Sequence, residues 1–203
     1  MANETNRHII ISGIGRSGTT FLVKLFTELG MDTGFTPGNY PIFENCNAGL
    51  EIPLKRANAP YIVKDPRLCD YLPEVIALGK QIEHALIPVR KLEHAVKSRV
   101  SVQQRSAAML ETRKSVPGGL WDTTSDDQQQ QVLAEKFYRL VHNLTVYNIP
   151  TTFLDFPRLA NDASYLFEKL KPILNVDYEA FQQIFKRVAD PTAIHDFDVD
   201  SLI

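Results

Sequence analysis

The sequence has few of the features that mark a secreted or membrane-bound protein. Only two cysteines, Cys46 and Cys69, occur in 203 residues, which is too few for a disulfide framework or for a zinc site without histidine ligands. The segment Met1–Arg7 is polar and the apolar run after it is only Ile9–Ile11, whereas a signal sequence needs about 7–15 apolar residues and a membrane-spanning helix about 20. We therefore expect a soluble cytoplasmic protein with two unpaired thiols and no membrane partner.

The chain also lacks an excess of charge of either sign. It has 22 lysines and arginines and 24 aspartates and glutamates, a formal net charge of −2. Nucleic-acid binding needs an excess of cationic side chains to displace phosphate counterions, so we expect no nucleic-acid partner. Any anion must instead be bound by a local arrangement of loops and individual arginines.

The composition is that of one folded domain. Hydrophobic residues make up 44% and charged residues 23% of the chain, the ordinary globular mixture, which excludes disorder as the default state. A domain usually takes about 100–200 residues. We expect a single domain over residues 1–203, with residues 190–203 as a loose acidic tail.

Short strands alternate with helical segments along the chain. Residues 7–12 form a β-branched run that ends at a glycine, which is typical of a buried parallel strand. Apolar residues then recur at helical spacing over residues 21–29, and Gly30 supplies the C-terminal cap. Further strands are expected at residues 61–63, 85–89 and 151–154, and further helices at 68–79, from 92 onward, from Ser125 to Pro150, at 165–170 and at 178–188. The alternation predicts an α/β protein with three αβα layers around a central, mostly parallel sheet.

Two local features add to this prediction. Ser125 followed by Gln128 has the spacing of a capping box at the start of a helix. Residues 31–60 contain four prolines and three glycines without a clear period. Long irregular connections of this kind are usually binding segments or lids, so we expect functional residues there.

A glycine-rich loop joins the first strand to the first helix. Residues 13–20 read Gly-Ile-Gly-Arg-Ser-Gly-Thr-Thr. Glycines here let backbone N–H groups turn toward an anion, and the N-terminus of the helix adds its dipole. The spacing is that of a nucleoside-triphosphate loop, but Thr19 stands where the lysine of that loop belongs, and no strand clearly ends in a magnesium-binding aspartate. Hydrolysis of ATP or GTP is therefore disfavoured, and Arg16 is the cation of the loop.

The segment Arg16–Thr20 resembles the loop of the sulfotransferases that use 3′-phosphoadenosine 5′-phosphosulfate. The resemblance implies a P-loop-containing nucleoside-triphosphatase-like fold and a loop that wraps the 5′-phosphosulfate end of the donor without a metal ion. It covers about residues 8–160 and marks the chain as a small, divergent member of the family. The donor-binding loop residues that it implies are Gly15, Arg16, Ser17, Gly18, Thr19 and Thr20.

A second segment agrees with the resemblance. Arg90 ends a predicted strand, and Ser98 follows eight residues later on a predicted helix. The family binds the 3′-phosphate of the donor with an arginine and a serine at this spacing. A strand-end arginine and a serine two helical turns further along can converge on one phosphate. We expect Arg90 and Ser98 to bind the 3′-phosphate.

A third segment supplies candidates for the chemistry. Lys64 stands where the family has a lysine that stabilises charge on the bridging oxygen as the sulfuryl group leaves. The cytosolic members have a catalytic histidine two residues later, where this chain has Pro66. The carbohydrate-modifying branch uses a carboxylate base, and we favour Glu51 because the small residues before it suit a turn that presents a side chain to a ligand. The alternatives for the base are Glu44, Asp65 and the histidines His8, His84, His94, His142 and His195.

Other departures set the chain apart from the cytosolic members. Those enzymes end in a basic, glycine-containing segment that covers the donor, whereas this chain ends in an acidic tail. Residues 113–124, which contain Trp121, look only superficially similar, and they are interpreted as an acceptor-side loop or as ordinary loop packing. Phe156 stands where relatives often have a tyrosine that contacts the nucleotide.

The expected activity is in-line transfer of a sulfuryl group to a hydroxyl or amine of a small-molecule or carbohydrate acceptor. Arg16 and Lys64 stabilise charge on the transferring and leaving oxygens, and a carboxylate, with Glu51 favoured, deprotonates the acceptor. We expect no metal ion. Two alternatives stay open: a magnesium-dependent phosphotransferase that uses ATP, and a non-catalytic module that binds adenosine bisphosphate. The sequence leaves the acceptor and the oligomeric state open.

Overall fold

The computed structural model describes residues 6–43, 46–106 and 116–190. Two candidates for the base, Glu44 and His195, lie outside the described residues. The same holds for residues 113–115 of the expected acceptor-side loop and for residues 191–203 of the expected tail.

Four parallel strands form the central sheet, in the order β4-β1-β5-β6. Their bounds are β1 (Arg7–Ile11), β4 (Ile62–Lys64), β5 (Gln81–Val89) and β6 (Thr151–Asp155). β1 lies between two other strands, and its residues Ile9–Ile11 are buried, as the β-branched run predicts. All four expected strands are present, although β5 begins at Gln81 and not at Ala85.

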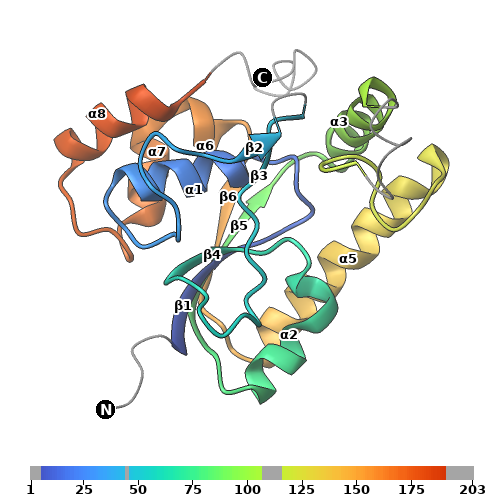
Figure 1. Cartoon of the computed structure of the whole chain (residues 1–203), viewed down its shortest axis with the longest axis horizontal. Helices are drawn as coiled ribbons and strands as arrows, with labels where there is room; N and C mark the ends of the chain where they lie inside the picture. Colours follow the sequence, from blue (N-terminus) through green and yellow to red (C-terminus); the bar gives the residue numbers. More distant parts are fainter. Residues whose placement is uncertain (1–5, 44–45, 107–115, 191–203) are drawn as a thin grey trace.

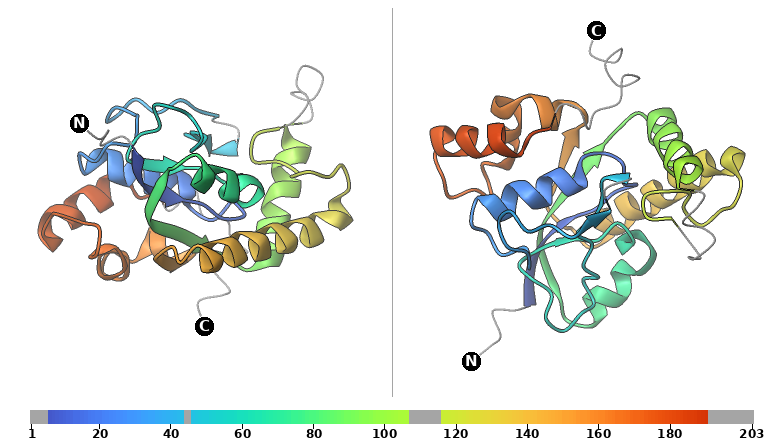
Figure 2. Two further views of the ribbon diagram at one scale, coloured as in Figure 1. Left: turned by 90° about the horizontal axis from the view of Figure 1, so that it is seen from below. Right: turned by 45° about the horizontal axis from the view of Figure 1, so that its top comes forward.

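Helices cover both faces of this sheet (Figure 1). Successive side chains of a strand point to opposite faces, so Ile9 and Ile11 belong to one apolar core and Ile10 to the other. The core that contains Ile9 and Ile11 is covered by α1 (Thr19–Glu28), α6 (Arg158–Asn161), α7 (Ala163–Leu170) and α8 (Tyr178–Val188). The core that contains Ile10 is covered by α2 (Leu68–Ala77), α3 (Leu92–Arg105) and α5 (Asp126–Val146). The predicted α/β architecture, a parallel sheet flanked by helices on both sides, is confirmed (Figure 2).

The helix ends agree with the sequence at α1 but not at α5. Gly30 ends α1 with φ 79° and donates its N–H to the carbonyl of Thr27. The capping box is wrong: Ser125 precedes α5, but its side chain makes no capping hydrogen bond. The hydroxyl of Thr123 lies 2.9 Å from Oε1 of Gln128 and accepts the N–H of Ser125. The side chain that should close the box is therefore bound to the loop before the helix.

The loops that carry the motifs meet at one edge of the sheet. The glycine loop follows β1, Asp65 follows β4, Arg90 follows β5 and Phe156 follows β6. The carboxyl ends of parallel strands share an edge, and ligands of open α/β sheets bind in the crevice outside it. The connection 31–60 adds a short antiparallel pair, β2 (Ile42–Phe43) and β3 (Ala48–Gly49).

Three further findings concern the described part of the chain as a whole. Both cysteines, Cys46 and Cys69, are buried and free, as expected. No helix in the described ranges is long and apolar enough to cross a membrane. The same ranges contain no group of three or more histidine, cysteine, aspartate or glutamate side chains placed to hold a metal ion.

Candidate functional site

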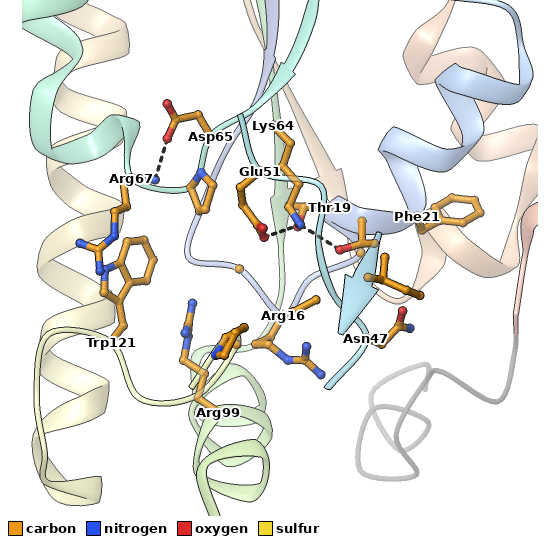
Figure 3. A pocket seen from close by; sticks show the side chains of 18 of the residues that line it. Arg16, Thr19, Phe21, Asn47, Glu51, Lys64, Asp65, Arg67, Arg99 and Trp121 are labelled. Carbon is orange, nitrogen blue, oxygen red and sulfur yellow. Dashed lines mark hydrogen bonds and ion pairs between the residues drawn. The ribbon is translucent and has the colours of Figure 1, made fainter. Parts of the chain in front are cut away.

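A pocket of about 1000 Å³ opens at the carboxyl ends of the strands (Figure 3). The glycine loop, the β2–β3 pair, the ends of β4 and β5 and the segment 116–121 line it. The predicted site residues among its lining are Gly15, Arg16, Gly18, Thr19, Thr20, Glu51, Lys64 and Arg90. Ser17 and Ser98 are fully buried and do not line the pocket.

Three residues of the glycine loop have a left-handed backbone conformation. Gly15, Arg16 and Gly18 have φ values of 70°, 58° and 84°, and adjacent residues in such conformations can turn their N–H groups toward one anion. Gly18 precedes α1 without a capping side chain, and the first turn of that helix contains no acidic residue. The hydroxyl of Ser17 is buried without a hydrogen-bond partner. An anion at the N-terminus of α1 is therefore favoured by the helix dipole, and no carboxylate of the first helical turn opposes it.

Arg16 joins this loop to the second predicted motif. Its Nε donates to the hydroxyl of Ser98 at 3.1 Å, and Arg90 donates from Nη1 to the carbonyl of Arg16. The guanidinium of Arg90 also lies 5.0 Å from the ring centroid of Phe156. The structure thus brings together Arg16, Arg90 and Ser98, which are up to 82 residues apart in the sequence.

The charge of Arg16 is held in a dry environment. Burial lowers the pKa of its guanidinium to about 10, and the positive charge of Arg90 acts in the same direction. Nη1 donates to the carbonyl of Cys46 at 2.5 Å. The side chain stays cationic at neutral pH, and it faces the pocket (Figure 3).

Lys64 lies at the centre of a second group of contacts. Its ammonium is 2.9 Å from the hydroxyl of Thr20, 2.6 Å from the carbonyl of Gly49 and 2.9 Å from the carboxylate of Glu51. The side chain of Lys64 is 4% exposed and that of Glu51 is 42% exposed. Burial lowers the pKa of Lys64, and Glu51 opposes that shift. The lysine and the glutamate that the sequence favoured for the chemistry are therefore an ion pair beside the glycine loop.

A tight turn presents Glu51. Asn47, Gly49 and Leu50 all have positive φ values, 45°, 135° and 65°. For non-glycine residues this conformation is strained, and such strain is common near ligand sites. The turn places the carbonyl of Cys46 on Arg16 and that of Gly49 on Lys64.

Asp65, an alternative base, is occupied by other partners. Its Oδ2 accepts the N–H of Leu54 at 2.8 Å and the hydroxyl of Tyr71, and its Oδ1 accepts the N–H of Arg67 at 3.1 Å. Burial raises the pKa of this carboxyl while these hydrogen bonds lower it. Asp65 anchors the loop before β4 to the start of α2.

The described histidines lie elsewhere: none of His8, His84, His94 and His142 lines the pocket. His8 is fully buried, with Nδ1 2.8 Å from the carbonyl of Pro60. His84 contacts the hydroxyl of Thr152 at 2.8 Å. Within the described residues, Glu51 remains the candidate base that lines the pocket with an exposed carboxylate.

Arg99 is a pocket residue that the sequence did not single out. Its Nη1 donates to the carbonyl of Gly119 and its Nη2 to the carbonyl of Ile14, both at 2.6 Å. A Cβ on Gly15 would lie 2.7 Å from the same Nη2, so this glycine is needed for the approach of Arg99 to the loop. Burial lowers the pKa of Arg99 to about 9. Its position directly after Ser98 is the only signal that the sequence offers.

Trp121 forms a wall of the pocket beside Arg99. The ring centroid of Trp121 lies 4.9 Å from the guanidinium carbon of Arg99. The backbone N–H of Trp121 donates to Oε1 of Gln129 at 2.6 Å. The residue expected on the acceptor side therefore does line the pocket, and α5 holds it in place.

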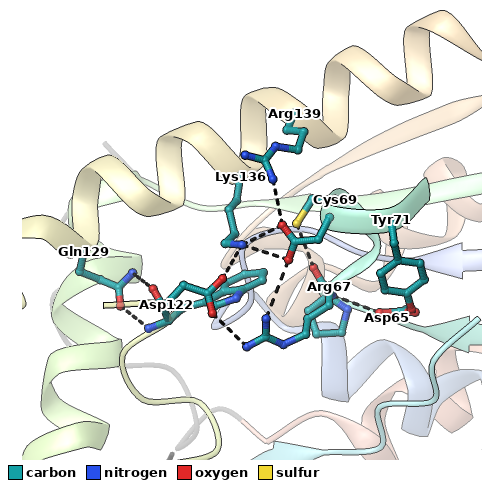
Figure 4. A network of polar contacts seen from close by, with 11 residues as sticks. Asp65, Arg67, Cys69, Tyr71, Asp122, Gln129, Lys136 and Arg139 are labelled. Carbon is teal, nitrogen blue, oxygen red and sulfur yellow. Dashed lines mark hydrogen bonds and ion pairs between the residues drawn. The ribbon is translucent and has the colours of Figure 1, made fainter. Parts of the chain in front are cut away.

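A network of ion pairs holds the same wall in place (Figure 4). Lys136 of α5 lies 2.8 Å from Asp70 of α2 and 2.6 Å from Asp122. Arg67 lies 3.2 Å from Asp122, and Arg139 lies 3.2 Å from Asp70. These ion pairs link the start of α2, the loop at Asp122 and α5, so the wall is held in place by contacts from three segments.

Comparison of the chain with protein-family models, with curated proteins and with solved structures finds no match.

Proposed function

We propose that this chain is a sulfotransferase with a P-loop-like fold, which moves a sulfuryl group from 3′-phosphoadenosine 5′-phosphosulfate to a hydroxyl or amine of a small-molecule or carbohydrate acceptor. The observation that carries the proposal is the meeting of two motifs at Arg16. The glycine loop and the Arg90–Ser98 pair were each assigned to a phosphate of the same donor, and they touch through Arg16 Nε and Ser98 Oγ at 3.1 Å.

The donor would be held at both anionic ends. N–H groups of the glycine loop and the hydroxyls of Thr19 and Thr20 bind the 5′-phosphate at the N-terminus of α1. Arg90 binds the 3′-phosphate through charge-assisted hydrogen bonds, and Ser98, which is buried behind the pocket, positions Arg16 beside it. An arginine and a lysine supply the positive charge, so we expect donor binding without magnesium.

Residues of the pocket can serve each part of the transfer step. The acceptor oxygen or nitrogen forms a bond to sulfur while the bond from sulfur to the bridging oxygen breaks, and the electron pair of that bond stays on the phosphate oxygen. Lys64 stabilises the charge on this oxygen, Arg16 stabilises the oxygens of the transferring group, and Glu51 takes the acceptor's proton. The 2.9 Å between Lys64 and Glu51 supports a role for both at one reacting centre.

Thermal shift measurements with three nucleotides test the donor assignment. We expect adenosine 3′,5′-bisphosphate to raise the melting temperature of the protein more than AMP or ATP does, with or without magnesium. An equal response to AMP would remove the role of Arg90 and Ser98. A response to ATP that requires magnesium would favour the phosphotransferase instead.

A transfer assay then separates the enzyme from a binding module. The protein is incubated with radiolabelled 3′-phosphoadenosine 5′-phosphosulfate and a panel of phenols, amines and sugars. Transfer of label to an acceptor supports the enzyme. Tight binding of the bisphosphate with no transfer across the panel would favour the module.

A further inference from the structure

Part of the pocket is not used by the proposed donor site. Its lining includes Lys55, Arg67, Tyr71, Arg99 and Trp121. In Figure 3, Arg99 extends into the pocket between Trp121 and Arg67 on one side and Arg16 on the other. Arg99 therefore stands at the boundary between the donor-binding loop and a second, aromatic part of the pocket.

Arg99 carries a buried charge without an acidic partner. Arg99 is only 7% exposed, and its Nη atoms donate to two backbone carbonyls. Nε has no hydrogen-bond partner. The charge of Asp122 acts on Arg99, but Asp122 forms its ion pairs with Arg67 and Lys136. None of the ion pairs among the described residues includes Arg99. A buried charge left uncompensated is unfavourable, so this part of the pocket favours an anion.

The pocket around Arg99 carries further positive charge, which also favours an anion. Lys55 is exposed, and its ammonium lies 4.7 Å from the ring centroid of Tyr71. Arg67 lies 5.7 Å from the ring centroid of Trp121. Among the described residues, seven lysines and arginines but only four aspartates and glutamates line the pocket, although the whole chain carries a net charge of −2. The positive charge is concentrated here.

We propose that Arg99, with Lys55 near the opening, binds a carboxylate or phosphate group of the acceptor. The inference rests on the proposed function and narrows its substrate to a hydroxyl or amine compound that also bears an acidic group. The ring of Trp121 lies beside Arg99 and that of Tyr71 beside Lys55, so the body of the acceptor is expected to be flat or apolar. Its acidic group then lies on Arg99, and its nucleophile faces Lys64 and Glu51.

The single tryptophan of the chain makes the subsite measurable. Trp121 lies 4.9 Å from Arg99, so its fluorescence reports an anion bound there. The full chain is saturated with adenosine 3′,5′-bisphosphate and titrated with inorganic phosphate at constant ionic strength. We expect a saturable change in fluorescence, and in Arg99→Gln a dissociation constant raised about 10- to 100-fold, the loss typical of a hydrogen bond to a charged group.

Two more variants keep the test independent of folding. Arg99→Gln removes bonds to Ile14 and Gly119, so Lys55→Gln, an exposed change, is measured beside it and is expected to raise the phosphate dissociation constant several-fold. Lys171→Gln is the matched control, since Lys171 is exposed, pairs with Glu168 and does not line the pocket. It should leave the titration unchanged.

The remaining outcomes overturn the inference. A wild-type protein without a saturable change has no anion subsite at Trp121. Equal phosphate affinity in wild type, Arg99→Gln and Lys55→Gln removes both residues from it. Phosphate that competes with the bisphosphate, or bisphosphate binding lost in Arg99→Gln, assigns Arg99 to the donor. If the bisphosphate does not bind wild type, the proposed function fails, and the same variants compared without it still decide whether Arg99 binds an anion.

Discussion

The ammonium of Lys64 lies 2.9 Å from the carboxylate of Glu51, although Lys64 ends strand β4 and Glu51 belongs to the loop that follows β3. The lysine is almost fully buried, whereas the glutamate is 42% exposed and lines the pocket. Sulfuryl transfer needs a cation at the leaving oxygen and an acceptor for the proton of the nucleophile. These two groups are side by side here, so a donor oxygen that binds Lys64 would weaken the ion pair and leave Glu51 available as a base.

Glu51→Gln separates these two roles. The amide can still accept a hydrogen bond from Lys64, but it cannot take a proton. We expect kcat to fall by about 10²–10⁴, the usual contribution of a general base, while affinity for adenosine 3′,5′-bisphosphate changes little. Steady-state kinetics and calorimetry measure the two effects.

Glu74→Gln is the control for that experiment, because Glu74 is an exposed glutamate of α2 outside the pocket. It should leave both quantities unchanged. Unchanged turnover in Glu51→Gln would place the base elsewhere. A parallel loss of bisphosphate affinity would show instead that Glu51 serves to position Lys64.

Arg16→Ala tests the cation of the glycine loop. Removing a preorganised cation from a transfer site lowers the rate by about 10²–10³. The fold should be kept, because Arg16 belongs to neither apolar core. Turnover of the variant is compared with its circular dichroism and thermal unfolding. Retained turnover in a folded variant would contradict the assignment.

Arg90→Ala should act on donor binding more than on the chemical step. Arg90 is expected to contact the 3′-phosphate, which AMP lacks. Calorimetry should therefore show that the binding free energy of adenosine 3′,5′-bisphosphate is weakened by about 1.5–3 kcal/mol, the contribution of a charge-assisted hydrogen bond. The affinity for AMP should change little. Equal losses for both nucleotides would mean that Arg90 supports the loop through the carbonyl of Arg16.

The parts that could be predicted from sequence depend on local patterns. The β-branched run of β1 and the loop that follows it are contiguous, so strand, glycine loop and helix could be assigned together. The capping box at Ser125 also looked local. It was wrong because Gln128 has a competing partner, Thr123, which the spacing rule does not consider.

The parts that could not be predicted depend on partners distant in the chain. Arg99 lies 85 residues from Ile14, whose carbonyl it binds, and no periodicity marks it as a pocket residue. Asp65 is a candidate base in the sequence, since its partners cannot be recognised there. Its hydrogen bonds to Leu54 and Tyr71 form only once β4 and α2 are in place. Whether a carboxylate is an anchor or a base is decided by packing.

Gly18→Ala probes the backbone of the loop. Gly18 has φ 84°, and an added Cβ would lie 2.9 Å from Cδ1 of Leu159. A left-handed conformation costs a non-glycine residue about 1–2 kcal/mol, and the clash adds to it. We expect a lower unfolding free energy and weaker bisphosphate binding. Gly38→Ala is the control, since Gly38 has φ 74° but open space around it; it should lose stability without losing binding. Equal stability losses in the two variants would show that Leu159 does not constrain the loop.

His8 should make the stability of the protein depend on pH. Its Nδ1 lies 2.8 Å from the carbonyl of Pro60 and its Nε2 lies 3.5 Å from the ammonium of Lys80. Burial lowers the pKa of His8, and Lys80 acts in the same direction. In the unfolded chain the group titrates near its ordinary pKa of about 6.5. At pH values between the lowered pKa of the folded state and about 6.5, the unfolded state binds more protons than the folded state. The free energy of unfolding is therefore highest above this pH range and decreases as the pH falls through it.

His8→Gln removes this titration and keeps an amide that can donate to Pro60. We expect its melting temperature to fall less than that of wild type when the pH is lowered from about 7.5 to about 5.5, across the ordinary histidine pKa. Some dependence should remain, because burial also lowers the pKa of His84. His142→Gln, at an exposed position on α5, should follow the wild-type curve. If His8→Gln follows that curve too, the buried imidazole is not the group that couples folding to pH, because the variant keeps every other histidine and the surroundings that set their protonation.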